Sequence, residues 1–171
     1  MRNQESQTAL VTGASGFIGQ ALVAHLQAKG YRVIAVVRDT TKVNFDPRVE
    51  VYLQSDISGD SCWDPHVLSK ASVIFHLAGR AHVLHETADD PLSLFRAVNR
   101  DGTIALAEQA VVAGVKRLVF VSSIGVLGNV SGDTGFTETT LPKPHDDYAI
   151  SKLEAEQALA QIADNSDVEI V

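Results

Sequence analysis

The hydrophobic positions along the chain follow two different periods. Six short apolar runs are typical of strands, at 8–12, 32–37, 49–53, 72–77, 117–122 and 168–171. Four segments between them carry apolar residues at helical spacing, at 17–29, 64–70, 91–113 and 147–163. Strands that alternate with helices form βαβ units. The pattern therefore predicts an α/β fold, a doubly wound parallel sheet (Rossmann fold) with the strand order 3-2-1-4-5-6.

The turn between the first predicted strand and the first predicted helix is rich in glycine. Gly13, Gly16 and Gly19 follow a G-x-x-G-x-x-G spacing. In a strand–turn–helix setting, such glycines allow a sharp turn, a close backbone approach to phosphates and tight packing of the helix on the sheet. The free N–H groups of the helix N-terminus attract the same anion. This turn predicts a dinucleotide pyrophosphate site made of Gly13, Ser15, Gly16, Phe17, Ile18 and Gly19.

The end of the second predicted strand indicates which dinucleotide binds. A carboxylate that would bind the adenosine 2′-hydroxyl is usual there, but Val37 is followed by Arg38. An arginine pairs with a 2′-phosphate, and the missing carboxylate removes a repulsion. We therefore expect NAD(P) as the cofactor, with a preference for NADP(H). Asp39 is one residue further on, within reach of the ribose, so NAD(H) remains open.

The segment after the third predicted strand contains Asp56 and Ile57, which we assign to the same cofactor site. Parallel strands end at one edge of the sheet, so these residues should lie near the glycine turn. The Asp56 carboxylate would accept a hydrogen bond from the adenine amino group. A loop or helix-capping aspartate is the alternative interpretation.

Tyr148 and Lys152 are four residues apart at the start of a predicted helix. At that spacing both side chains lie on one face, one turn apart. A nearby ammonium should lower the tyrosine pKa from its ordinary value of about 10, so that Tyr148 can exchange a proton with an alcohol or sugar oxygen. Ser122 and Ser123 end the fifth predicted strand at the edge where ligands bind. The set predicts a proton-transfer centre.

With these motifs in view, the chain resembles the extended short-chain dehydrogenase/reductases of the NAD-dependent epimerase/dehydratase family, which act on nucleotide sugars. The motifs that carry the resemblance lie at 12–19, 76–79, 99–103, 122–123 and 148–156. The resemblance implies that Ser123 is the catalytic serine, that Tyr148 is the acid/base, and that Lys152 binds the nicotinamide ribose and tunes Tyr148. It also implies cofactor-lining or strand-bracing roles for Leu77, Ala78, Gly79 and Asn99.

Some positions depart from the commonest family pattern. Gly79 stands where alanine is usual, and Leu127 replaces a frequent tyrosine. These differences argue against a housekeeping UDP-galactose 4-epimerase. The run at 80–83, together with the Ser123 region, resembles a bacterial branch that makes surface-polysaccharide precursors, as 4-epimerases or 4-keto reductases of UDP-linked 6-deoxy or N-acetylated sugars. A reductase of a small non-sugar ketone, similar to the dihydroflavonol reductases, is the second hypothesis, and a non-catalytic dinucleotide-binding sensor is the third. The family also implies a homodimer through the 91–113 and 147–163 helices.

Composition limits the classes of partner and the compartment that we expect. The formal net charge is −7 and there is no run of lysine or arginine, so we expect no nucleic-acid partner. The single cysteine, Cys62, and the lack of a signal sequence or a long apolar run predict a cytoplasmic chain that does not cross a membrane.

Two further expectations concern metals and domain organisation. His76, His82, His85 and Glu86 match no usual ligand spacing, so we expect no metal and place these residues at the mouth of the cofactor and substrate site. The 171 residues should form one Rossmann domain that ends in its sixth strand. We expect it to be the N-terminal part of a longer protein, without the substrate domain and with little turnover alone.

Overall fold

The computed structural model describes residues 7–81, 89–133 and 135–171. A parallel sheet of six strands runs through them in the order β3-β2-β1-β4-β5-β6, which confirms the predicted fold class and order. The strands are β1 (Thr8–Thr12), β2 (Arg32–Val37), β3 (Glu50–Leu53), β4 (Val73–His76), β5 (Arg117–Phe120) and β6 (Glu169–Ile170). The strand order reverses between β1 and β4, where open α/β sheets bind ligands.

Helices connect the strands. The α-helices are α1 (Phe17–Ala28), α2 (Pro65–Lys70), α3 (Pro91–Arg96), α4 (Gly102–Val112) and α5 (Asp147–Asp164). Three shorter helical segments are η1 (Thr40–Lys42), η2 (Ala97–Asp101) and η3 (Ile124–Val126). In the part of the chain that the structure describes, no helix is both long enough and apolar enough to cross a membrane.

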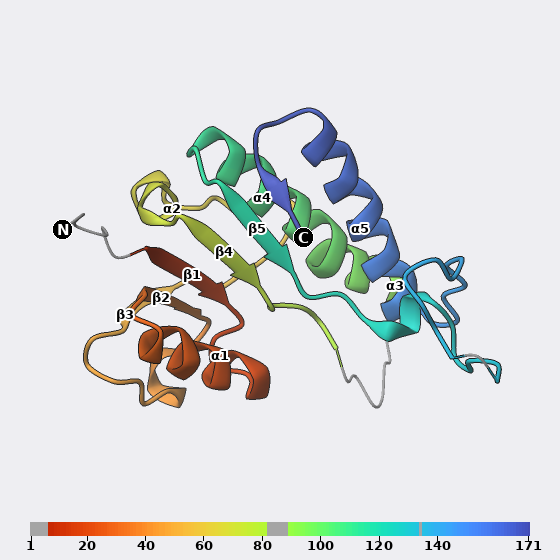
Figure 1. The fold of residues 1–171 in the computed structure, drawn as a ribbon, viewed down its shortest axis with the longest axis horizontal. Coiled ribbons are helices and arrows are strands. Elements are labelled where there is room, and N and C mark those ends of the chain that lie inside the picture. The colour runs from red at the N-terminus through yellow and green to blue at the C-terminus, as the bar shows by residue number, and fades with distance from the viewer. Residues whose placement is uncertain (1–6, 82–88, 134) are drawn as a thin grey trace.

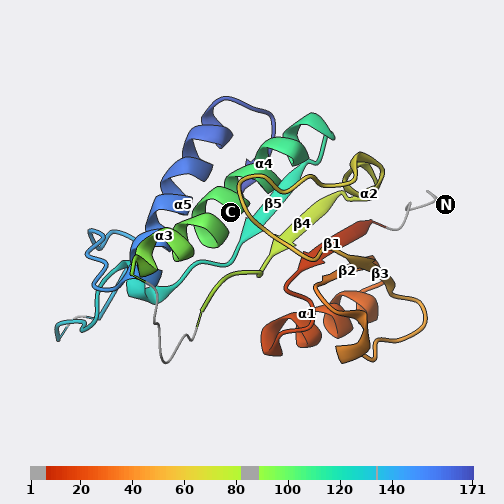
Figure 2. The ribbon, with the colours of Figure 1, turned by 180° about the vertical axis from the view of Figure 1, so that it is seen from behind.

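The helices lie on both faces of the sheet (Figures 1 and 2). On one face, Val23 and Leu26 of α1 pack against Ala9 and Val11 of β1. On the other face, the side chains of α2, α4 and α5 pack against the alternate strand positions, with Leu10 among them. Each central strand is therefore buried on both sides, which explains its nearly continuous apolar sequence.

One long helix was predicted over 91–113, and the structure corrects this prediction. The segment is divided into α3 and α4 by η2, a turn of π-helix. Asn99 lies in this turn and is almost completely buried. A π-helical turn places an extra residue in the helix and is frequent at functional sites. The polar contacts of Asn99, given below, supply the physical reason for the interruption.

The predicted fifth strand also ends earlier than expected. β5 stops at Phe120, so Ser122 and Ser123 lie in the loop that follows it. Ser123 is the N-cap of η3, and its Oγ accepts a hydrogen bond from the Gly125 N–H at 3.2 Å. The short helical turn fixes the backbone beside the carboxyl edge of the sheet.

Candidate cofactor and catalytic site

The glycine turn after β1 is pressed against the loop after β4. Gly13 has φ +66°, and a Cβ on it would lie 2.8 Å from the Ala78 nitrogen and 2.9 Å from the Leu77 carbonyl carbon. A Cβ on Gly19 would lie 2.2 Å from the Gly13 carbonyl oxygen. Both positions therefore exclude any side chain, and the N-terminus of α1 begins directly after this closely packed turn, at Phe17.

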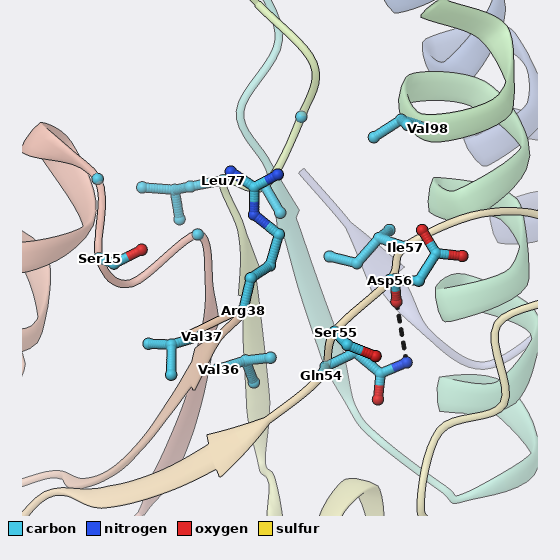
Figure 3. A pocket seen from close by; sticks show the side chains of 14 residues that line it. Ser15, Val36, Val37, Arg38, Gln54, Ser55, Asp56, Ile57, Leu77 and Val98 are labelled. Carbon is cyan, nitrogen blue, oxygen red and sulfur yellow. Dashed lines mark hydrogen bonds between the residues drawn. The ribbon is translucent and has the colours of Figure 1, made fainter. Parts of the chain in front are cut away.

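A pocket opens at the carboxyl ends of β1 to β4, beside this turn (Figure 3). Its walls come from the glycine turn, from the loops after β2, β3 and β4, and from η2. The lining residues are Gly13, Ser15, Gly16, Val36, Val37, Arg38, Gln54, Ser55, Asp56, Ile57, Leu77, Ala78, Gly79 and Val98. The pocket thus spans the point at which the strand order reverses.

Most of the cofactor residues predicted from the sequence line this pocket, and some lie elsewhere. Those in the lining are Gly13, Ser15, Gly16, Arg38, Asp56, Ile57, Leu77, Ala78 and Gly79. Those outside the lining are Phe17, Ile18, Gly19, Asn99, Tyr148 and Lys152. Phe17 is 96% exposed and begins α1, and Gly19 supports the turn from behind.

Sequence reasoning missed several lining residues. Gln54 and Ser55 follow the short edge strand β3, and Val98 precedes Asn99 in η2. The position of Gln54 directly after a strand was an available signal, because strand ends share one edge. No sequence signal identified Val98, since its orientation depends on a π-helical turn that a period of 3.6 residues does not predict.

Arg38 and Asp39 are adjacent in sequence but have different surroundings. In Figure 3 the Arg38 side chain extends into the pocket, between Ser15 and Asp56 in this view. The Asp39 carboxylate instead caps η1, where it accepts from Thr41 N at 2.9 Å and from Thr41 Oγ1 at 2.6 Å. These hydrogen bonds lower the pKa of Asp39, as does its ion pair with Lys42. In this structure the Asp39 carboxylate is thus directed to its own loop.

Asp56 lies in the pocket wall and has partners within its own loop. Its carboxylate accepts a hydrogen bond from Ser58 Oγ at 2.8 Å, and its carbonyl accepts one from Gln54 Nε2 at 3.0 Å (Figure 3). It caps no helix, because α2 begins only at Pro65 with Asp64 as its N-cap. A carboxylate held in this way retains free lone pairs for a second donor.

Lys152 is the most buried cation of the described chain, at 4% exposure. Its Nζ donates to the Val121 carbonyl at 2.8 Å and lies 3.7 Å from the centre of the Phe120 ring. Both partners belong to β5 or the residue just after it. Burial lowers the pKa of Lys152 to about 8, because a charged ammonium loses solvation there.

Tyr148 lies one turn earlier on α5, and its pKa differs from the sequence expectation. Burial raises the pKa of Tyr148 above its ordinary value, and hydrogen bonding to the Ser123 side chain opposes this only in part. The expectation that Lys152 lowers this pKa is therefore wrong. The reason is geometric, since the Lys152 ammonium is held by Val121 and Phe120. Ser123 and Tyr148, in contrast, are brought together as predicted.

Asn99 connects α5 to the loop after β4. Its Oδ1 accepts from Arg80 N at 2.7 Å, while its Nδ2 donates to Arg80 O and to Ser151 Oγ, each at 3.0 Å. Ser151 in turn donates to the Tyr148 carbonyl at 2.7 Å. Asn99 therefore braces the site from behind and contributes no surface to the pocket, whereas its neighbour Val98 does.

His76 was placed at the site mouth by sequence reasoning, and this prediction is wrong. The residue is 1% exposed, and its ring nitrogens contact Thr12 Oγ1 at 2.7 Å and Thr103 Oγ1 at 3.0 Å. A histidine at the end of a central parallel strand is enclosed by the neighbouring strands, which the local sequence did not reveal. His82, His85 and Glu86 lie outside the described residues. Within the described ranges, no group of three His, Cys, Asp or Glu residues is arranged to hold a metal.

Comparisons with known proteins agree with this geometry. The model of the NAD dependent epimerase/dehydratase family matches residues 9–171. The chain is 40% identical over 165 residues to a UDP-glucose 4-epimerase of Vibrio cholerae, an alignment that covers 95% of this chain and 49% of the relative.

Solved structures of the same type are also similar. MoeE5 in complex with UDP-glucuronic acid and NAD has a TM-score of 0.77 and 32% identity, over 95% of this chain and 52% of that one. A UDP-glucose 4-epimerase of Thermotoga maritima with UDP-glucose has a TM-score of 0.77 and 27% identity, over 96% and 53%. The chain thus spans about half the length of the relatives it matches.

Proposed function

The chain belongs to the NAD-dependent epimerase/dehydratase family, and from this premise we propose that it forms the cofactor-binding half of a nucleotide-sugar 4-epimerase or 4-keto reductase with a Ser123–Tyr148–Lys152 centre. The observation that carries the proposal is that the cofactor pocket and the Ser123–Tyr148 pair lie along the same edge of the sheet. A pocket with a glycine turn lies at the ends of β1 to β4, and the interacting pair Ser123 and Tyr148 lies beyond the end of β5.

The residues of the pocket fit a dinucleotide. A Cβ at Gly13 would fill the space between the turn and Ala78, so only glycine at this position lets the turn lie this close to the loop after β4. α1 begins at Phe17 without a side-chain cap and without an acidic residue in its first turn, so its N–H groups are free to receive a pyrophosphate. The Asp56 carboxylate, fixed by Ser58, is an acceptor suited to the adenine amino group.

The proposed chemistry divides between cofactor and protein. A bound nicotinamide supplies hydride transfer at C4 of the sugar. Tyr148 gives or takes the proton on the C4 oxygen, and the Ser123 hydroxyl holds that oxygen next to the phenol. Lys152 has three donors, of which the one bonded to Val121 O fixes its position, and the others would hold the ribose hydroxyls.

We assign the choice between the two nicotinamide cofactors to Arg38. NAD is bound in the similar MoeE5 complex, and the coarser assignment of NAD(P) covers both cofactors. The Arg38 side chain lies in the pocket while the Asp39 carboxylate is used to cap η1. This arrangement provides a cation for a 2′-phosphate and no carboxylate against it, and so supports a preference for NADP(H).

The remaining parts of the proposal concern substrate and assembly. A UDP-linked sugar is the substrate class, because the similar structures named above contain UDP-sugars. We place the enzyme in the cytoplasm, in the synthesis of surface-polysaccharide precursors, as a homodimer through α3–α4 and α5. The sugar-binding half would come from sequence equivalent to the part of the relatives that this chain does not span.

The test replaces Tyr148 with phenylalanine in a protein that contains both halves of the site. Turnover of UDP-glucose and UDP-galactose should fall by about 10²- to 10⁴-fold, because the proton-transfer group is lost. Cofactor affinity, measured by calorimetry, should not change. A Tyr148→Phe variant with full turnover would falsify the mechanism. Robust epimerase activity of the 171-residue chain alone would contradict the division into two halves.

A further inference from the structure

A line of buried hydrogen bonds runs from the loop after β4 to α5, with the His76 ring at its centre. Its side chains are each 1% exposed or less: Thr12, His76, Asn99, Thr103 and Ser151. At one end, Thr12 Oγ1 accepts from the N–H groups of Leu77 at 3.2 Å and Ala78 at 3.1 Å. At the other end, Ser151 joins Asn99 to the Tyr148 carbonyl. The line thus links the pocket wall with the catalytic helix.

The direction of each bond follows from the donors available. The Thr103 hydroxyl has one proton and donates it to the Asn99 carbonyl at 2.7 Å, since a carbonyl only accepts. At its contact with His76 Nε2, 3.0 Å away, Thr103 must therefore accept. His76 consequently carries a proton on Nε2.

The bonds at Thr12 fix the other ring nitrogen. Thr12 Oγ1 already accepts from two backbone N–H groups, of which the Leu77 N–H is shared with the Thr12 carbonyl oxygen at 3.3 Å, so both of its lone pairs face a donor. Its own proton needs an acceptor, and His76 Nδ1 lies 2.7 Å away. An imidazolium would bring a third donor to Thr12 and leave the hydroxyl proton without an acceptor, whereas the neutral ring satisfies every group.

The surroundings of the ring also keep it neutral. Burial lowers the pKa of His76 to about 3, and the positive charge of Lys152 acts in the same direction. The Phe120 ring stacks on His76 at a centroid distance of 5.9 Å and also contacts the Lys152 ammonium. Among the described residues, no carboxylate contributes to the pKa of His76, so nothing there favours the charged form.

We propose that His76 is a positioning residue, held as the neutral Nε2–H tautomer, which ties the Leu77–Gly79 wall of the pocket to η2 and, through Asn99 and Ser151, to α5 at Tyr148. Its Nδ1 orients the Thr12 hydroxyl that holds the Leu77 and Ala78 amides. Its Nε2–H orients the Thr103 hydroxyl on Asn99. The influence on cofactor affinity rests on the proposed function, while the tautomer and the order of bonds do not.

The first experiment measures the tautomer directly. The 171-residue chain is labelled with ¹⁵N, and the ring nitrogens of its histidines are recorded by NMR between pH 5 and 8, with a His76→Asn sample to assign the signal. We expect a neutral ring over this whole range, with the proton on Nε2. A proton on Nδ1, or titration to the imidazolium in this range, overturns the proposal whether or not the chain binds a cofactor.

The second experiment separates positioning from simple stability. His76→Leu removes both ring bonds, and His76→Asn keeps an acceptor near the Nδ1 position for Thr12. The control is Gln109→Leu, which removes partly buried hydrogen bonds to Trp63 N, Ser61 O and Ala105 O, away from the line. Cofactor affinity is measured by calorimetry at a temperature at which thermal melting shows all variants to be folded.

The expected result is a loss of affinity that does not follow stability. His76→Leu should weaken cofactor binding about tenfold, His76→Asn should restore most of it, and Gln109→Leu should change it less than about twofold. Equal losses for His76→Leu and Gln109→Leu, in proportion to their melting temperatures, would overturn the positioning role. A wild-type chain that binds neither NAD(H) nor NADP(H) contradicts the proposed function instead, and leaves the tautomer measurement as the deciding test.

Discussion

At the β1–β3 end of the sheet edge, the candidate cofactor pocket is made largely of turn backbone and of side chains such as Arg38 and Asp56 that face solvent. At the β5–α5 end, Lys152 and Ser151 are buried and hydrogen-bonded to neighbouring segments. One region presents N–H groups and exposed charges, and the other presents side chains whose positions depend on a network.

This difference indicates which substitutions each region tolerates. A pocket built from backbone tolerates most side-chain changes but fails when a Cβ enters a closely packed turn. A site built from buried polar side chains depends on complete pairing, because an unpaired buried group is costly. The predictions below test this contrast, from the largest expected effect to the smallest.

The largest effect is expected for Gly13→Ala. The new Cβ would meet the Ala78 nitrogen at 2.8 Å, and φ +66° is unfavourable for alanine by about 1–2 kcal/mol. Cofactor affinity should fall by about 100-fold or more, since the turn and the β4 loop must separate. Calorimetry and urea unfolding provide the measurements.

The matched control for this change is Gly114→Ala. Gly114 has φ +76°, but nothing lies within 4 Å of a Cβ there. It should lose about 1 kcal/mol of stability and keep full cofactor affinity. Equal effects of the two substitutions on binding would show that backbone strain, and not close approach, is what matters at Gly13.

The second prediction concerns Lys152 and pH. The pKa of Lys152 is about 8 in the folded chain and its ordinary value is 10.5, so the unfolded chain binds more protons between these pH values. The free energy of unfolding should therefore rise with pH across this window, by about 3 kcal/mol for this group alone. The destabilisation by the buried charge should be greatest below pH 8. The difference in unfolding free energy between wild type and Lys152→Met, followed from pH 8 to 10.5, measures this contribution.

Lys70→Met serves as the control, because Lys70 is half exposed and paired with Glu50 on the surface. The Lys70→Met difference is subtracted from the Lys152→Met difference at each pH, so that the general effect of losing a lysine cancels. A corrected difference that does not change between pH 8 and 10.5 would mean that the buried ammonium is better solvated than its contacts indicate.

The third prediction concerns the exposed charge in the pocket. Arg38→Ala should weaken NADPH binding about tenfold and leave NADH binding nearly unchanged, because the charge-assisted bond to the 2′-phosphate is lost. Arg48→Ala, at an exposed arginine that pairs with Asp46 away from the pocket lining, should affect neither cofactor. Tighter NADH binding by wild type, without any effect of Arg38, would instead favour a 4-epimerase that retains NAD.

The smallest effect is expected for Asp39→Ala. The carboxylate caps η1 through Thr41, so its loss should lower the melting temperature slightly. Affinity for NADH and NADPH should change by less than about twofold, since the group serves its own loop. A clear and selective loss of NADH affinity would place Asp39 on the ribose and reverse our interpretation of this pair.

The sequence allowed the fold and the backbone-built region to be predicted well. Strand order and the glycine turn follow from local rules, since apolar runs and a G-x-x-G-x-x-G spacing act over a few residues. Arg38 and Asp56 were found because the residues after parallel strands meet at one edge. Gln54 and Ser55 followed the same rule and were overlooked.

The buried region was predicted less well, for a physical reason. His76, Thr103 and Ser151 acquire their roles from partners between 27 and 64 residues away. Such pairs depend on how strands and helices stack, which periodicity does not encode. The prediction that the pKa of Tyr148 is lowered failed for the same reason, because this pKa depends on burial and on where the Lys152 ammonium is bound.

The π-helical turn at Ala97–Asp101 has a consequence for the registry of the whole segment. Each residue of an α-helix advances the direction of its side chains by about 100°, so one inserted residue puts α3 and α4 out of phase by that angle. Phe95 of α3 can thus contact the Tyr148 ring edge-on, and Leu106 of α4 can pack in the core. Between them, Val98 lines the pocket and Asn99 bonds to Ser151 of α5. Removing one residue from this turn would restore the ordinary helical spacing and direct one of these sets of side chains away from its partners.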